Sequence, residues 1–105
     1  MLRIVAFIGF AALVSCFSSG EPGQNPGQEP INAEKIYGYK CALCHGNDGK
    51  AGIAGATDLS ASRIALQDRI DVITGGRGSM MPFRDLLTQE EIEALAIYIE
   101  QLRKP

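Results

Sequence analysis

The chain has 105 residues, with 10 Lys and Arg against 12 Asp and Glu, and a net charge of −2 at pH 7. A chain of this length excludes a two-domain enzyme and most folds with a large cleft. Its basic residues are scattered rather than clustered, which argues against a nucleic-acid partner. Three cysteines and a single histidine are the chemical features that stand out.

The N-terminus has the pattern of an export signal. Arg3 precedes an apolar run over 4–14, and these 11 residues are too few for a membrane span of roughly 20. The run ends in Leu-Val-Ser-Cys16, which resembles the bacterial lipobox, a motif whose cysteine is lipidated and becomes the mature N-terminus. We therefore expect a lipoprotein-type signal peptide over 1–15. The alternative is an ordinary cleavage site in which Cys16 has no role.

Residues 16–30 consist, after the cysteine, mostly of Gly, Pro, Ser, Gln and Glu. Such a composition does not pack and is typical of a flexible tether. The remaining 75 residues, 31–105, are the expected folded domain. A core of that size is marginal by itself and usually depends on disulfides, a metal or a cofactor.

Two helices are predicted in the first part of this domain. Asn32 suits the N-cap of a short helix over 33–39. The Gly-rich, polar sequence over 46–57 lacks strand-like alternation and is expected to form a loop. A helix over 64–74 follows, ended by two glycines. Its apolar side chains share one face: Leu66, Ile70 and Ile73.

The last helix has the clearest signals. Thr88 and Glu91 form a capping box at its start, and Arg103 and Lys104 suit the negative end of its dipole. Its apolar stripe comprises Ile92, Leu95, Ile99 and Leu102. No convincing strand is present, so the predicted fold class is all-α, with three or more short helices and long loops. These apolar faces are thin for a self-sufficient core, which favours a cofactor.

The string Cys41-Ala-Leu-Cys44-His45 carries the most specific chemical signal. Two cysteines at this spacing reach the two vinyl groups along one edge of a haem, and the adjacent histidine then offers its imidazole to the iron. A zinc site would lack a fourth ligand unless Cys16 supplied it. A redox-active cysteine pair would follow a strand, and a plain disulfide would leave His45 unexplained. Covalent haem is the interpretation that uses all three residues.

The other axial ligand is expected to be a methionine, because the chain has no second histidine. Met80 and Met81 are adjacent in a Gly-rich loop that ends in Pro82-Phe83. Methionines usually fill gaps in a core, but two together in such a loop fit core packing poorly. Thioether ligation raises the reduction potential of haem iron, which suits a protein that passes electrons.

From about residue 32 to 104 the chain resembles a class I cytochrome c of the short bacterial kind. The resemblance rests on the haem motif, on the Met81-Pro82-Phe83 loop and on the closing helix with Leu95 and Tyr98. It implies a small cytochrome c fold wrapped around one covalent haem c. It also implies that thioethers form at Cys41 and Cys44, that the axial ligands are His45 and Met81, and that Met80 packs beside the haem.

The same resemblance implies a crossing of the first and last helices at Ala33, Tyr37, Leu95 and Tyr98. The chain departs from the family pattern in two places. Ala33 stands where glycine is usual, and Thr57 stands where a proline commonly supplies the carbonyl that receives the proximal imidazole N–H. A carbonyl needs no proline, so this hydrogen bond is expected to survive.

Two arginines are weaker candidates for contact with the haem. Arg77, beside the methionine loop, either pairs with a haem propionate or is a solvated loop charge. Arg63 is a less favoured candidate for the same role.

By resemblance, we expect a membrane-tethered electron carrier on the periplasmic side of a bacterial membrane, with no enzymatic activity and no small-molecule substrate. Its expected partners are redox proteins such as a quinol-oxidising complex or a terminal oxidase. Two alternatives are an electron-relay subunit of a larger oxidoreductase and a haem-based ligand sensor.

Overall fold

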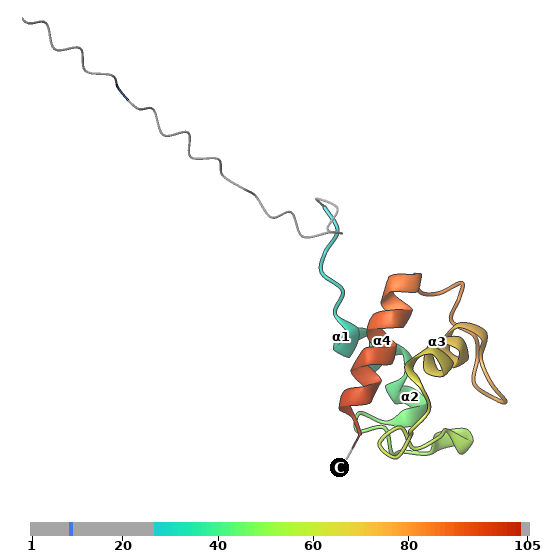
Figure 1. The fold of residues 1–105 in the computed structure, drawn as a ribbon. Helices are drawn as coiled ribbons and strands as arrows, with labels where there is room; N and C mark the ends of the chain where they lie inside the picture. The colour runs from blue at the N-terminus through green and yellow to red at the C-terminus, as the bar shows by residue number, and fades with distance from the viewer. Residues whose placement is uncertain (1–8, 10–26, 104–105) are drawn as a thin grey trace, which may run out of the picture.

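A computed structural model describes Gly9 and residues 27–103 of the chain. The predicted signal peptide apart from Gly9, Cys16, most of the tether, Lys104 and Pro105 lie outside the described residues. Within the described part, the elements are four α-helices and one short 3₁₀ turn, and no strand occurs. None of these helices has the length and hydropathy needed to span a bilayer. The all-α prediction is confirmed (Figure 1).

Helix α1 (Ala33–Lys40) begins as predicted, because the Asn32 side chain accepts a hydrogen bond of 2.9 Å from the Lys35 amide. A single-turn helix, α2 (Ala42–His45), follows at once, with Cys41 between the two. The sequence did not predict α2, because four residues are too few to show a helical period.

The loop after α2 contains the 3₁₀ turn η1 (Ile53–Gly55). Gly46 ends α2 at a φ of 77°, and a Cβ atom placed there would lie 2.8 Å from the Ala51 Cβ. Glycine is therefore required at this position. The sharp turn it makes carries the chain away from the haem motif and into the loop.

Helix α3 (Leu66–Gly75) begins two residues later than predicted. Ile73 is buried and Ile70 half-buried, whereas Leu66 is exposed, contrary to the predicted stripe. The loop after it is tight: a Cβ on Gly76 would lie 2.5 Å from the Met80 carbonyl oxygen. Two backbone hydrogen bonds between Arg77 and Met80 close a turn that presents the methionines.

Helix α4 (Gln89–Gln101) confirms its prediction most closely. Both hydrogen bonds of the Thr88–Glu91 capping box are present. Its buried face comprises Ile92, Leu95, Ala96 and Ile99. The helix ends before Arg103, whose side chain turns back to Glu100 and the Ile64 carbonyl.

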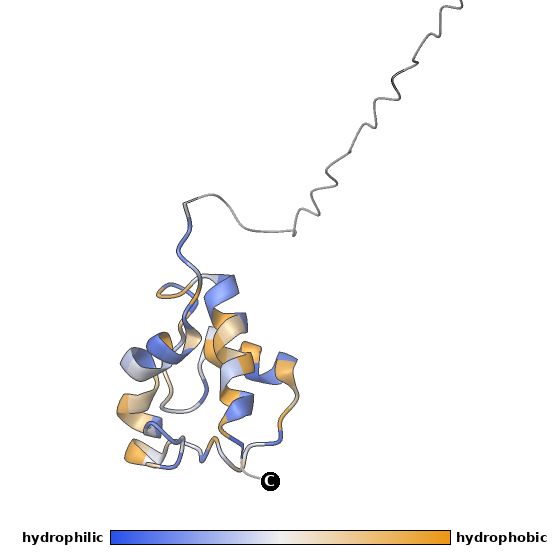
Figure 2. Ribbon diagram, turned by 90° about the vertical axis from the view of Figure 1, so that its left-hand side faces the viewer, coloured by the Kyte–Doolittle hydropathy of each residue, from blue (hydrophilic) through white to orange (hydrophobic). Residues whose placement is uncertain are grey.

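Helix α4 packs against both α1 and α3, and this packing forms the core. The Tyr37 and Tyr98 rings lie 5.3 Å apart at an angle of 53°, and Leu95 is fully buried beside Tyr37 in the same cluster. The predicted packing of Tyr37 with Leu95 and Tyr98 where α1 meets α4 is confirmed. Ala33, at the start of α1, is half-buried. Figure 2 shows hydrophobic and hydrophilic segments alternating along the helices, as expected when one face packs inward.

Candidate functional site

A mostly apolar cavity of about 340 Å³ lies between α2, η1, α3 and the methionine loop. It is bounded on the core side by side chains such as Ile73, Phe83 and Ile99. Its wall also includes every haem-contacting residue predicted from the two motifs: Cys41, Cys44, His45, Met80 and Met81. Segments almost 40 positions apart in the sequence thus meet at one cavity.

The two motif cysteines differ in their surroundings. Cys41 is buried and joins the core, and burial raises the pKa of its thiol to about 11. Cys44, one helical turn later, is exposed, and both are free thiols. Cys41 lies at the N-terminal end of α2 and Cys44 within it, and both cysteines line the cavity.

The imidazole of His45 is held by the main chain. Its Nδ1 lies 2.9 Å from the carbonyl oxygen of Thr57. Because a carbonyl can only accept, Nδ1 carries the proton and donates, which leaves Nε2 with a free lone pair. The expected hydrogen bond is therefore kept without the family's usual proline. This is the orientation that a histidine needs to ligate a metal.

The segment that supplies the Thr57 carbonyl is braced by its neighbours. Asp58 accepts hydrogen bonds from the Ser60 amide at 2.9 Å and from the Ser60 hydroxyl at 2.6 Å. The hydroxyl bond is the main reason that the pKa of Asp58 lies below its usual range. A buried Ser60 thus fixes the turn beside Thr57.

Tyr37 connects the helix crossing to the histidine. Its hydroxyl donates a 2.7 Å hydrogen bond to the carbonyl of Gly46, the residue directly after His45. Burial raises the pKa of Tyr37 to about 12. The sequence predicted the packing role of this tyrosine but not the hydrogen bond, because nothing in the local pattern relates positions 37 and 46.

The two methionines differ in burial. Met80 is partly buried and packs against the core cluster, whereas Met81 is 54% exposed. Both line the cavity, so both thioethers are available to a ligand there.

Comparison with known proteins agrees with this geometry. Residues 28–99 match the family model described as cytochrome c oxidase, cbb3-type, subunit III. The chain belongs to this family of c-type cytochromes.

The chain is similar to several small proteins, and this similarity shows that it is a small class I cytochrome c. Cytochrome c6 of Leptolyngbya boryana is 30% identical over 62% of this chain and 82% of its own length. A cytochrome c6-like protein of Nostoc sp. is 28% identical over 98% of this chain and 94% of its own. The solved structure of the KustC0563 c-type cytochrome matches with a TM-score of 0.65 and 30% identity, covering 70% of this chain and all of the other.

The cytochrome is also similar to part of a larger protein. The cbb3-type cytochrome c oxidase subunit FixP of Azorhizobium caulinodans is 30% identical over 88% of this chain. The chain spans only 33% of the length of FixP.

The residues around the cavity fit the haem c that this family carries. The donor set is one imidazole with a free Nε2, two thioethers and two thiols, all at one apolar cavity. Imidazole and thioether are the axial ligands of cytochromes c, and thiols on a C-x-x-C-H string form its covalent links.

The sequence suggested Arg77 and Arg63 as candidates for contact with the haem, and only Arg77 lies at the cavity. Arg77 lines the cavity and is exposed, whereas Arg63 lies outside its wall and donates to the carbonyls of Ser60 and Ser62. A third arginine, Arg69, lines the cavity and is only 3% exposed. Sequence reasoning missed it, because an arginine between apolar helix positions is normally assigned to the solvent face.

Proposed function

We propose that this cytochrome is a single-electron carrier whose one haem c is bound covalently through Cys41 and Cys44. The observation that carries the proposal is the His45–Thr57 hydrogen bond of 2.9 Å, which holds the free Nε2 at a cavity also lined by Met80 and Met81. Bound there, the haem iron supplies one-electron chemistry between its ferrous and ferric states. The chain itself has no catalytic role in this proposal and takes no small-molecule substrate.

We propose Met81 rather than Met80 as the second axial ligand. Met80 already packs against the core cluster, whereas the Met81 side chain is 54% exposed and not held by that packing. The family pattern, in which the ligand directly precedes the proline, supports the same assignment. Met80 then serves as a packing residue beside the haem.

Separate replacement of the two methionines by alanine tests this assignment. We expect Met81→Ala to abolish the methionine–iron charge-transfer band and lower the reduction potential, because a thioether favours ferrous iron. We expect Met80→Ala to keep the band. Its free energy of unfolding should fall by less than the ~2–5 kcal/mol that is typical when a fully buried methionine is replaced by alanine. Loss of the band only in Met80→Ala would reverse the assignment, and its persistence in both variants would refute methionine ligation.

We further propose that the cytochrome is exported and tethered to the periplasmic side of a membrane. The support is the sequence alone: a signal peptide over 1–15, the lipobox-like Cys16 and a tether to residue 30. Fractionation of cells that produce the wild type and the Cys16→Ser variant tests it. We expect the wild type in the membrane fraction and the variant in the soluble periplasm. The same distribution for both would contradict the tether.

The proposed partners are larger redox proteins, in particular a terminal oxidase. The match to the cbb3-type subunit III family and to FixP supports this partner class. The same match favours a second candidate, an electron-relay subunit within such an oxidase. Stable, stoichiometric co-purification with an oxidase would favour the relay subunit, and isolation as a free protein would favour the carrier.

A further inference from the structure

The Thr57 carbonyl that accepts the hydrogen bond from His45 lies in an exposed segment without a proline. A residue in such a segment rotates about its backbone dihedrals unless other contacts hold it. Rotation there would move the carbonyl oxygen and lengthen its 2.9 Å contact with His45 Nδ1. The orientation of the imidazole therefore depends on the contacts that fix the backbone beside Thr57.

The Asp58 carboxylate closes a turn directly after Thr57. Its Oδ1 accepts hydrogen bonds from the Ser60 amide at 2.9 Å and from the Ser60 hydroxyl at 2.6 Å, so one oxygen holds two donors of the same residue. An aspartate that bonds the backbone two residues further on fixes the chain without a proline. Ser60 is only 5% exposed, so the far end of this turn is anchored in the interior.

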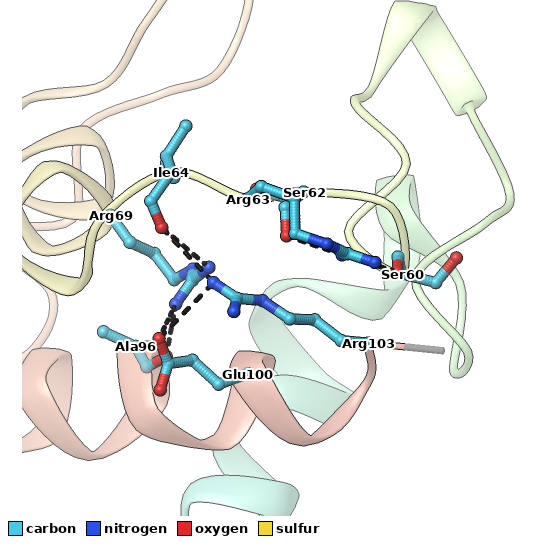
Figure 3. A network of polar contacts seen from close by, with 8 residues as sticks. All are labelled: Ser60, Ser62, Arg63, Ile64, Arg69, Ala96, Glu100 and Arg103. Atoms are coloured by element: carbon cyan, nitrogen blue, oxygen red, sulfur yellow. Dashed lines mark hydrogen bonds and ion pairs between the residues drawn. The ribbon is translucent and has the colours of Figure 1, made fainter. Parts of the chain in front are cut away.

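Two further contacts fix the position of this turn. The Leu59 amide donates to the Gly49 carbonyl at 2.9 Å, which ties the turn to the loop after α2. This close approach requires glycine, because a Cβ on Gly49 would lie 2.9 Å from the Leu59 Cβ. On the other side, Arg63 donates to the Ser60 carbonyl at 3.4 Å (Figure 3). The turn is thus fixed relative to the helix that carries the imidazole.

We infer that Asp58 is a positioning residue for His45. Its turn replaces the proline that the family commonly has at position 57, and it holds the Thr57 carbonyl against the imidazole. This inference rests on the proposed haem site. A hydrogen bond from a ligating imidazole to a carbonyl raises the basicity of the ligand, which stabilises ferric iron. A looser bond therefore favours the reduced state.

Exchange of the His45 Nδ1 proton with solvent measures this contact directly, by NMR of the reduced, full-length, haem-loaded protein. We expect Asp58→Ala to raise the exchange rate about tenfold, which matches the smaller effects on metal sites of losing a group that orients a ligand. Asp58→Asn keeps an acceptor oxygen and should leave the rate within about twofold of the wild type. A wild-type rate in Asp58→Ala would overturn the inference.

Asp48→Ala is the matched control for this experiment. Asp48 accepts a hydrogen bond of 3.0 Å from the amide of Lys50, so its turn has the same spacing as that of Asp58. The Asp48 turn does not include the segment directly after Thr57, and its loss should leave the exchange rate unchanged. An equal rise in Asp48→Ala and Asp58→Ala would show general loosening and would contradict a specific role for Asp58.

Redox titration of the same variants separates the contact from the charge of Asp58. Loss of a negative charge and loss of the hydrogen bond both raise the reduction equilibrium constant, whereas Asp58→Asn loses only the charge. We expect Asp58→Ala to raise the constant about threefold more than Asp58→Asn does. Equal constants in the two variants, with a lower stability only in Asp58→Ala, would give Asp58 a purely structural role and refute the inference.

A proline at position 57 provides an independent test. Ala56 has a φ of −57° and a ψ of 132°, which suits the residue before a proline, and within the described part of the chain the Thr57 amide donates no hydrogen bond. We expect Thr57→Pro alone to keep the wild-type exchange rate. In the Asp58→Ala background it should return the rate to within about twofold of the wild type. A tolerated Thr57→Pro that fails to rescue Asp58→Ala would overturn the inference.

Ser60→Ala keeps the inference testable if Asp58→Ala fails to load haem. It removes the 2.6 Å hydroxyl bond and keeps the amide bond, so we expect the exchange rate to rise about threefold. A rate equal to that of the wild type would then count against the positioning role. Absence of covalent haem from the wild type would instead overturn the proposed function.

Discussion

The imidazole of His45 is oriented by a main-chain carbonyl, so the backbone position of residue 57 matters more than its side chain. The Thr57 oxygen lies 2.9 Å from His45 Nδ1 although no proline stiffens this segment. The Asp58–Ser60 hydrogen bonds provide a local constraint instead. The sequence could predict that the bond survives, since any residue supplies a carbonyl, but the brace depends on a turn conformation that only the structure shows.

Tyr37 gives a prediction with a defined pH window. Its pKa rises from the ordinary value of 10.0 to about 12, chiefly because burial disfavours the phenolate. A raised folded-state pKa contributes stability that is complete below pH 10 and is lost as the pH rises through about 12. We expect Tyr37→Phe to remove the phenolate absorbance step near pH 12 and to cost about 1 kcal/mol through the lost hydrogen bond to Gly46.

Tyr39→Phe is the matched control, because Tyr39 is 70% exposed. It should leave the step near pH 12 in place. Persistence of that step in Tyr37→Phe, with its loss in Tyr39→Phe, would contradict the account of Tyr37.

At the scale of elements, helices with strong end signals were predictable and those defined by their partners were not. The capping box placed the start of α4, and Asn32 placed the start of α1. Helix α3 begins late because the Ile64 carbonyl faces the arginines and Ala65 is extended. Both α2 and the burial of Arg69 depend on contacts that no local pattern encodes.

The part of the candidate site that belongs to short sequence motifs was predictable. The haem motif and the methionine pair predicted five residues of the site. The structure places all five at one cavity: Cys41, Cys44, His45, Met80 and Met81. The hydrogen bond from Tyr37 to Gly46 and the ion pair from Arg69 to Glu100 link positions that no motif relates. Neither could be found from one sequence, because each depends on how two helices pack.

At the scale of the whole molecule, the domain is small and its core modest. Among the described residues, eight hydrophobic side chains are buried, and they lie mainly where α4 meets α1 and α3. The loops that complete the molecule surround the cavity rather than fill it. A large apolar cofactor would add the contacts that so small a core lacks, which is how the proposed haem accounts for the fold as well as the function.

The visible absorption spectrum of the purified full-length protein tests the central claim most directly. We predict a low-spin c-type haem in both oxidation states. It should be retained after denaturation, because the proposed links to Cys41 and Cys44 are covalent. The reduced form should not bind carbon monoxide, because the proposed ligands His45 and Met81 would leave the iron no open axial position. A protein without covalent haem, or a reduced form that binds carbon monoxide readily, would contradict the account of a His/Met-ligated electron carrier.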